Sequence, residues 1–402
     1  MGNSSFDVVI VGAGIVGLAT GMKLLEAYPG LTAAVLDKEG GIAAHQTGHN
    51  SGVIHSGLYY KPKSLKARLC VSGARTLVDF CREHGVAHEI CGKVVVATTA
   101  EQLPALDELF RRGTENDVPG LKMLEPAEVR EIEPHVRCMR GLLVPGTGIV
   151  DFTTVAGAYA DVFKKAGGKI FLGRKVVRVS AEGGGVRVGT TDGEISARVL
   201  VNCAGLYSDR VARVSGFIPP CRIVPFRGEY HRIRPERGYL VKNLIYPVPD
   251  PRFPFLGVHF TRMIDGKIEA GPNAVLALAR EGYSRVKIDP LELLEILCYG
   301  GFWRLVSRYW KSGMAEMARS FSKRLFARSL QELIPDVSER DLAPGGAGVR
   351  AQALAPDGKL LDDFVVLQNE RMVHVLNAPS PAATSSMAIA GHIVEGAAGL
   401  FG

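Results

Sequence analysis

Two histidines stand in segments that could carry acid–base chemistry. His55 lies in a stretch, residues 45–60, that is rich in glycine, histidine and hydroxyl side chains, a composition that suits ligand contacts better than a packed core. His259 lies in an apolar segment that is typical of a strand. Because the reference pKa of histidine is about 6.5, either side chain could take a proton from a substrate near neutral pH. We expect His55 to contact the substrate, with His259 as the second candidate for the base; a structural role is the alternative for either.

Two arginines could bind a carboxylate, because the planar guanidinium group matches its two oxygens. Arg350 stands in the glycine-rich sequence GAGVRAQ, and we expect it to contact the substrate. Arg227, in PFRGEY, is the second candidate, with an ion pair to Glu229 as its alternative. Three tyrosines could line the same pocket: Tyr59, Tyr60 and Tyr246.

A glycine motif near the N-terminus predicts a site for a dinucleotide. Gly12, Gly14 and Gly17 form a G-x-G-x-x-G directly after the β-branched run 8–11 and directly before a helical stretch. The first glycine permits a tight turn, the second lets a pyrophosphate approach the backbone, and the third lets helix and strand pack closely. Asp37 ends the next apolar strand, where it could accept hydrogen bonds from a ribose; capping that strand end is its alternative role.

Three further segments favour FAD over NAD. The polar stretch 45–60 suits contacts to a ribityl chain and an isoalloxazine ring. A buried strand at 199–203 ends in small residues, where a nucleotide could approach the backbone. Residues 377–386 form a loop of small residues that opens the last helix, and its amides could stabilise negative charge on a flavin pyrimidine.

These motifs resemble those of the D-amino-acid oxidase-type flavoproteins, and among them the L-2-hydroxyglutarate dehydrogenases or oxidases. The resemblance covers essentially the whole chain and is closest in TGHNSGVIHSGLYYKPKSLKA, VPFRGEYH, GPNAV, GAGVRAQ and NAPSPAATSS. The usual acid after the second strand is Glu in the superfamily, whereas this chain has Asp37. The residues expected at the FAD are Gly12, Gly14, Ile15, Val16, Gly17, Asp37, Lys38, Thr47, Gly48, Asn50, Ser51, Gly52, Val176, Ala204, Gly205, Pro381, Ala382, Ala383 and Thr384.

The resemblance implies oxidation of L-2-hydroxyglutarate, a small dicarboxylate, to 2-oxoglutarate. A hydride would pass from C2 to flavin N5, a histidine would take the hydroxyl proton, and a quinone or oxygen would receive the electrons. The alternatives are an FAD-dependent amino-acid or glycerol-3-phosphate oxidase or dehydrogenase on the same scaffold, and a non-catalytic nucleotide-binding protein.

The order of the predicted elements indicates an α/β protein with α+β insertions. A βαβ unit opens the chain, strands and loops follow in the middle, and a strand–helix unit ends it. We expect a Rossmann-like FAD-binding domain built from residues 1–90, 148–215 and 340–402. A substrate domain on a mixed or antiparallel sheet would take residues 91–147 and 216–339, including a helical segment at 291–333.

A basic, aromatic segment stands inside that helical region. Residues 300–330 hold seven basic residues and one acidic residue, so they carry +6 of the formal net charge of +7. Apolar residues, including both tryptophans, recur there at steps of three and four, as on one helix face. This pattern suits a helix on an anionic membrane surface. We expect a cytoplasmic protein that could lie peripherally on the inner or plasma membrane; core helices or an oligomer contact are the alternatives, and nucleic acid is not expected.

Composition excludes several other classes. The chain has 402 residues, 47% hydrophobic and 22% charged, which is unlike a disordered or collagen-like protein. Seven cysteines without a Cys-x-x-Cys pair predict neither a disulfide framework nor a metal site. The first residues do not match a secretory signal or a myristoylation site. The longest apolar stretch, 8–22, is shorter than the ~20 residues that span a bilayer.

Overall fold

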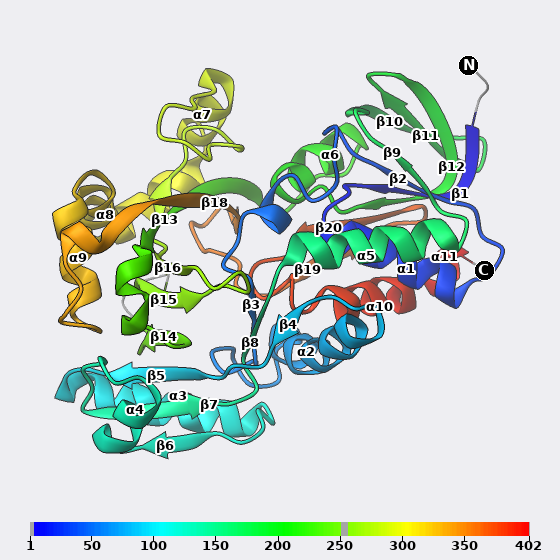
Figure 1. Ribbon diagram of the computed structural model, residues 1–402. Helices are drawn as coiled ribbons and strands as arrows, with labels where there is room; N and C mark the ends of the chain where they lie inside the picture. The colour runs from blue at the N-terminus through cyan, green and yellow to red at the C-terminus, as the bar shows by residue number, and fades with distance from the viewer. Residues whose placement is uncertain (1–3, 251–255, 402) are drawn as a thin grey trace.

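The computed structural model describes residues 4–250 and 256–401, and two large sheets dominate it (Figure 1). The first sheet follows the order β10-β11-β12-β1-β2-β9, with β20 beside β12 and β19 beside β20. Its strands are β1 (Ser4–Val11), β2 (Ala33–Leu36), β9 (Lys169–Phe171), β10 (Val176–Glu182), β11 (Gly185–Thr190), β12 (Gly193–Asn202), β19 (Val365–Gln368) and β20 (Met372–Asn377).

The centre of this sheet is parallel because helices connect its strands. Val8 pairs with Ala33 on β2 and with Val199 on β12, and all three side chains are buried. Runs that are buried on both faces are typical of such strands. Four helices pack together on one face (Figure 1): α1 (Ile15–Ala27), α2 (Leu65–Glu83), α5 (Phe152–Lys165) and α10 (Ser386–Gly396). The short helices α6 (Ser208–Val214) and α11 (Ala398–Phe401) complete this half of the molecule.

The second sheet is mostly antiparallel and follows the order β17-β13-β16-β15-β14-β5-β7-β6, with β18 along the other edge of β13. Its strands are β5 (Lys93–Ala97), β6 (Lys122–Leu124), β7 (Arg140–Val144), β13 (Arg222–Ile233), β14 (Leu244–Pro247), β15 (His259–Arg262), β16 (Ile268–Gly271), β17 (Val275–Leu276) and β18 (Leu342–Leu354). A small third sheet links the two halves through β3 (Val53–Ile54), β4 (His88–Glu89) and β8 (Gly148–Val150).

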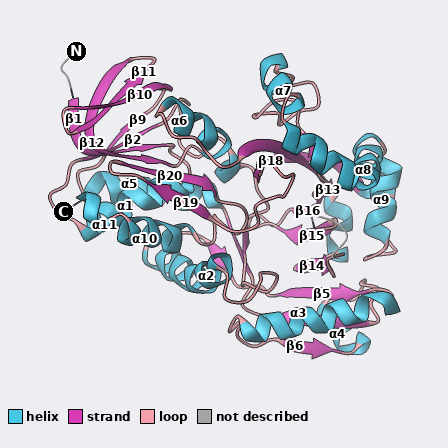
Figure 2. Cartoon of the chain, turned by 180° about the vertical axis from the view of Figure 1, so that it is seen from behind, coloured by secondary structure: helices cyan, strands magenta, loops and turns pink. Residues whose placement is uncertain are grey.

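Five helices accompany the second sheet: α3 (Leu103–Glu115), α4 (Pro126–Ile132), α7 (Pro290–Leu297), α8 (Gly300–Phe321) and α9 (Lys323–Gln331). The helix α9 is held to the sheet by Phe326 and Leu330, which are buried in one cluster with Ile245. Seen from behind in Figure 2, α8 and α9 lie at the opposite end of the molecule from α1 and α10. Among the described residues, no helix combines the length and the apolar character needed to cross a bilayer.

The predicted α/β class with a Rossmann-like start and a second, mixed sheet is confirmed. The proposed domain boundaries, at residues 90, 147, 215 and 339, stay a prediction. Helix α10 begins at Ser386, the last residue of the small-residue loop 377–386 that was expected to open the final helix. The part of the expected central sheet at 251–255 lies outside the described residues.

Candidate active site

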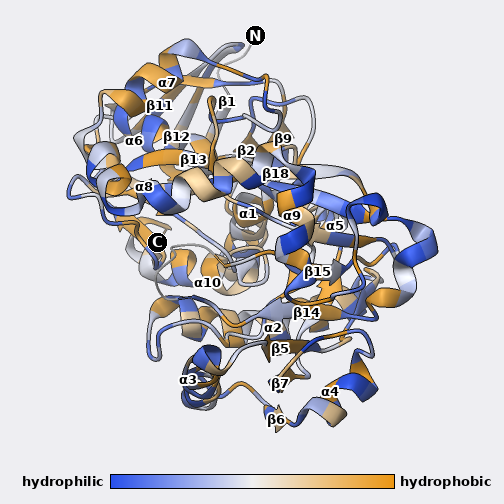
Figure 3. Cartoon of the chain, turned by 90° about the vertical axis from the view of Figure 1, so that its left-hand side faces the viewer, coloured by the Kyte–Doolittle hydropathy of each residue, from blue (hydrophilic) through white to orange (hydrophobic). Residues whose placement is uncertain are grey.

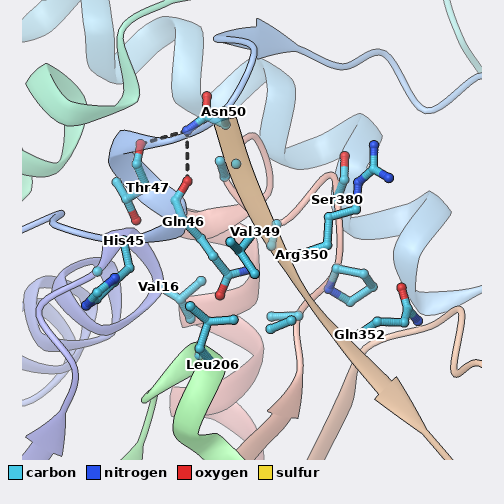
Figure 4. Close-up of a pocket in the computed structure, with 18 of the residues that line it drawn as sticks. Val16, His45, Gln46, Thr47, Asn50, Leu206, Val349, Arg350, Gln352 and Ser380 are labelled. Carbon is cyan, nitrogen blue, oxygen red and sulfur yellow. Dashed lines mark hydrogen bonds between the residues drawn. The ribbon is translucent and has the colours of Figure 1, made fainter. Parts of the chain in front are cut away.

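A cavity of about 1190 Å³ lies between the two large sheets. Single-ligand pockets commonly measure ~300–1,000 Å³, so this one can hold a dinucleotide together with a small substrate. Figure 4 shows Val349, Arg350 and Gln352 on β18 crossing the cavity, with Gln46, Thr47 and Asn50 facing them from the N-terminal loop. The cavity therefore joins the glycine motif to the second sheet.

The three motif glycines have the different surroundings that a dinucleotide site requires. Gly12 has φ +112°, and a Cβ there would collide with the carbonyl oxygen of Cys203. A Cβ on Gly17 would collide with the carbonyl oxygen of Gly12. On Gly14 it would meet only Thr47 Oγ1, at 3.4 Å, because this glycine faces the cavity. Thus Gly12 and Gly17 shape the turn, and Gly14 leaves room for a ligand.

Helix α1 begins at the cavity wall and is fixed there by two side chains. Ile15 N–H donates to Thr47 Oγ1 at 3.0 Å, and Ala13 N–H donates to Asp37 Oδ2 at 2.7 Å. Gly14, the N-cap of α1, has no side chain to cover the helix end. An exposed helix N-terminus attracts phosphate groups. Asp37 also accepts from Glu39 N–H at 2.9 Å and lines the cavity, so it combines the structural role with a position suited to a ribose.

The polar N-terminal loop is held in shape from within. The side-chain amide of Asn50 donates to the carbonyl oxygens of Gln46, at 3.1 Å, and Thr47, at 2.6 Å (Figure 4). Its Oδ1 accepts from Gly52 N–H at 2.8 Å. Gly52 has φ +64°, a conformation that favours glycine. The loop is therefore a rigid wall of the cavity.

Thr384 joins this wall to the C-terminal loop. Its hydroxyl donates to the carbonyl oxygen of Val53 at 3.2 Å and accepts from the backbone N–H of His55 at 3.1 Å. The residues from Ala378 to Thr384 all line the cavity. The two polar loops, which are more than 300 residues apart in sequence, thus form one surface, as expected for two segments that contact the same cofactor.

His55 lies where the two loops meet. Its Nε2 is 3.4 Å from Ser380 Oγ, and its ring lines the cavity. Burial, together with the positive charge of Lys93, lowers the pKa of His55 to about 3. The imidazole is therefore neutral at physiological pH and can accept a proton.

His259 lines the same cavity from β15. Its Nδ1 is 2.9 Å from the carbonyl oxygen of Gly257, so this nitrogen carries the hydrogen and Nε2 keeps its lone pair. The ring stacks on Tyr246, with centroids 3.9 Å apart. Burial lowers its pKa to about 3, and the nearby cations Arg350 and Lys93 act in the same direction. Both predicted histidines thus enter one cavity as neutral bases.

Arg350 brings a positive charge to the cavity, where it acts on His259. It lies on β18, opposite Phe226 of β13, and lines the cavity together with Tyr230. Burial lowers its pKa, and the Tyr230 hydroxyl acts in the opposite direction. Arginine stays protonated at any physiological pH even so. Tyr60 and Tyr59 line the same part of the cavity, where burial raises the pKa of both phenols and keeps them neutral hydrogen-bond donors.

Arg227 is placed differently from the prediction that it binds substrate. Its side chain is buried and pairs with Glu229 at 3.1 Å, and Nη1 donates to the carbonyl oxygen of Ser284 at 3.1 Å. Arg285 also pairs with Glu229, at 2.8 Å. Arg227 does not line the cavity. Alternate residues of a strand point to opposite faces. Gly228 and Tyr230 line the cavity, so Arg227 and Glu229 lie on the other face of β13, where their ion pair gives Arg227 a structural role.

Most of the residues expected at the cofactor line the cavity. Those that do are Gly12, Gly14, Ile15, Val16, Asp37, Lys38, Thr47, Asn50, Ser51, Val176, Ala204, Gly205, Pro381, Ala382, Ala383 and Thr384. Three others stand behind it, where any side chain would collide with backbone: Gly17, Gly48 and Gly52. The role of each residue at the bound cofactor stays a prediction.

Two residues on the second-sheet side of the cavity were not predicted from the sequence. Tyr230 lines the cavity, and burial raises its pKa to about 12; its strand, β13, gave no signal that singled it out. Lys93 is buried behind Tyr59 and Tyr246, although a lysine at the start of an apolar run suggests a solvent-exposed strand end.

Comparison with known proteins identifies the family. The family model "FAD dependent oxidoreductase" matches residues 7–395. L-2-hydroxyglutarate dehydrogenase of Indibacter alkaliphilus is 53% identical over 97% of this chain and 98% of its own. The mitochondrial L-2-hydroxyglutarate dehydrogenase of Homo sapiens is 46% identical over 98% of this chain and 88% of its own.

The fold has solved counterparts. L-α-glycerophosphate oxidase of Mycoplasma pneumoniae, determined with FAD bound, superposes with a TM-score of 0.81 at 20% identity, over 98% of this chain and 94% of that one. Glycine oxidase of Geobacillus kaustophilus gives 0.73 at 16% identity, over 98% and 95%. The open glycine, the N-terminus of α1 at the cavity wall and the two joined loops fit FAD, which confirms the cofactor expected from the sequence. The chain thus belongs to the family of FAD-dependent oxidoreductases.

Proposed function

We propose that the protein oxidises L-2-hydroxyglutarate to 2-oxoglutarate. The observation that carries this proposal is the meeting of two neutral histidines with Arg350 in one cavity, beside the glycine motif. An alcohol that bears carboxylates needs a base for its hydroxyl proton and a cation for its charge, and this cavity offers both. The relatives that are about half identical in sequence bear the name of this activity.

FAD, when bound, supplies the acceptor of the hydride. The chain itself orients the substrate and moves the proton. Arg350 would bind a carboxylate, and the hydroxyls of Tyr59 and Tyr60 could donate to the other oxygens. His55, where the two cofactor loops meet, is the first candidate to take the hydroxyl proton. His259 is the second, because its hydrogen bond to Gly257 leaves Nε2 free as an acceptor.

The proposal predicts a stereospecific loss of flavin colour. Mixed anaerobically with the purified FAD enzyme, L-2-hydroxyglutarate should bleach the flavin within seconds. The D enantiomer, L-amino acids and glycerol 3-phosphate should react at least ~100-fold more slowly. The D enantiomer has the same groups but cannot direct its C2 hydrogen at the flavin while its carboxylates keep the same contacts, and the other compounds differ in the polar groups that the site would bind. Stopped-flow absorbance measures the rates. Faster bleaching by an amino acid or by glycerol 3-phosphate would assign the enzyme to the corresponding alternative.

We further propose that the helices α8 and α9 rest on an anionic membrane, from which a quinone could take the electrons. The apolar stripe of this region faces outward in the structure: Trp303, Trp310, Met314, Met317, Phe321 and Leu325 are all exposed. Its core contacts are made by other residues, such as Phe302 and Leu305. Figure 3, which views the end carrying α8 and α9, shows hydrophilic and hydrophobic residues interleaved along both helices.

Positive charge accompanies this exposed stripe. Arg308, Lys311 and Arg324 are exposed beside it, and none of them pairs with a carboxylate among the described residues. Uncompensated cations next to exposed aromatic rings are complementary to anionic headgroups above acyl chains. A peripheral position on the cytoplasmic side of the inner or plasma membrane would bring the enzyme to a quinone pool; oxygen is the alternative acceptor.

Sedimentation with lipid vesicles tests this surface. The protein should pellet with vesicles that contain an anionic phospholipid at low salt and should stay in solution with purely zwitterionic vesicles. The double variant Arg308→Glu/Arg324→Glu should lose at least ~10-fold in vesicle affinity, at ~1 kcal/mol per basic residue near the surface. The double variant Arg68→Glu/Arg75→Glu, on the exposed side of α2, changes the net charge equally and should bind as the wild type does. Equal loss in both double variants, or no binding at all, would contradict the proposal.

A further inference from the structure

Lys93 is the first residue of β5, and it is buried in the protein interior with 1% of its surface exposed. A lysine is almost never buried to this degree unless an acid pairs with it. Among the described residues, its ammonium group forms no ion pair and no hydrogen bond, and the electrostatic partner that favours its charge is the Cys70 thiol. Lys93 is therefore a buried cation that still lacks its counter-charge.

Two aromatic rings, rather than a carboxylate, contact the ammonium group of Lys93. The Nζ atom lies 4.4 Å from the ring centroid of Tyr59 and 4.8 Å from that of Tyr246. Rings attract a cation through their negative faces, but they do not neutralise it. Both tyrosines also line the cavity, so one layer of side chains separates Lys93 from the space for the substrate.

In the described part of the chain, no ionised acid faces Lys93 from the surrounding elements. The titratable groups that interact with it are the Cys70 thiol of α2 and the imidazoles of His55 and His259. Burial raises the pKa of Cys70 to about 12, and both histidines are neutral. Burial also lowers the pKa of Lys93 itself to about 7. An anion that enters the cavity would favour the protonated form of this lysine.

We propose that Lys93 is a positioning residue whose charge, acting through Tyr59 and Tyr246, makes the cavity prefer doubly charged over singly charged substrates. The proposal rests on the proposed function, because a diacid brings one more negative charge than Arg350 can neutralise. In the dry interior the field of Lys93 crosses a tyrosine ring with little screening. The lysine thus completes the neutralisation of a dicarboxylate without touching it.

Two substrates that share a carbon skeleton and differ in the charge of the distal group measure this preference. L-2-hydroxyglutarate and L-2-hydroxypentanoate share five carbons, and a methyl group replaces the distal carboxylate in the second. In Lys93→Met, the ratio of kcat/KM for the diacid to that for the monoacid should fall at least ~10-fold, mainly through a higher KM for the diacid. Lys93→Arg, which keeps the charge, should retain most of the ratio. A Met variant that is folded and holds FAD, yet has an unchanged ratio, would overturn the proposal.

Binding of non-reacting anions separates this inference from the proposed function. Glutarate and pentanoate can be titrated into the FAD enzyme by calorimetry near pH 7, in buffers of different ionisation enthalpy. The wild type should prefer glutarate and take up a fraction of a proton with it. Lys93→Met should lose both effects, whereas Lys93→Arg should keep the preference and lose the uptake, since arginine does not titrate. No preference and no proton uptake in the wild type would refute the role of Lys93, whichever substrate the enzyme oxidises.

Discussion

Gly14→Val should yield a folded protein that has lost its FAD. A Cβ at Gly14 meets only Thr47 Oγ1, at 3.4 Å, so the protein itself has room for the new side chain. The added methyl groups would project into the cavity at the end of α1, where the pyrophosphate of FAD is expected. We expect the purified variant to be colourless, with a flavin content below ~1% of wild type and a far-UV circular dichroism spectrum like that of the wild-type apoprotein.

Gly157→Val is the matched control for this experiment. A Cβ at Gly157 on α5 has no neighbour within 4 Å, and the residue does not line the cavity, so this variant should stay yellow. Gly17→Val provides the opposite contrast, because its side chain would collide with the Gly12 carbonyl and should prevent folding. A Gly14→Val protein with full flavin content would show that the cofactor does not approach the backbone at this glycine.

His55→Ala should slow reduction of the flavin by roughly 10²–10⁴-fold while the cofactor stays bound. His55 lies where the two cofactor loops meet, and its neutral imidazole can take the hydroxyl proton as the hydride leaves. Its backbone N–H, rather than its ring, bonds to Thr384, so the substitution keeps the link between the loops. Anaerobic stopped-flow mixing with L-2-hydroxyglutarate measures the rate of reduction directly.

His259→Ala is the paired experiment, because both histidines are neutral and line one cavity. We expect it to lose less rate than His55→Ala and to weaken substrate binding through the lost packing on Tyr246. The reverse order of effects would assign the base to His259. Rates near wild type in both variants would exclude a histidine base altogether. A pH profile of the reduction rate adds a second criterion, since removing the base should flatten its acidic limb.

Local sequence signals predicted the cofactor half of the site. The glycine motif encodes part of its own turn, because a side chain on Gly17 would collide with the carbonyl oxygen of Gly12, five residues earlier, and Gly12 has a positive φ. Asn50 likewise bonds only to its neighbours in the loop. Such short-range contacts can be inferred from one sequence without knowledge of the tertiary fold.

The substrate half depended on long-range pairing and was predicted less well. Arg227 and Arg350 stand in similar glycine-containing segments, yet only Arg350 lines the cavity, whereas Arg227 pairs with Glu229. Which face of β13 or β18 points inward is set by their register, where Phe226 lies opposite Arg350. The burial of Lys93 could not be predicted from local sequence, because the rings that cover it come from residues 59 and 246, far away in the chain.

The link from Thr384 to Val53 and His55 has a consequence for how the protein is made. The wall that the two loops form is complete only when residues 378–384 have docked, and these residues follow β20, which pairs with β12 in the first sheet. Translation adds residues one at a time from the N-terminus, so the glycine motif leaves the ribosome some 370 residues before its partner loop does. The nascent chain can therefore form the glycine turn early, but the wall that residues 378–384 complete can form only after these residues have been synthesised.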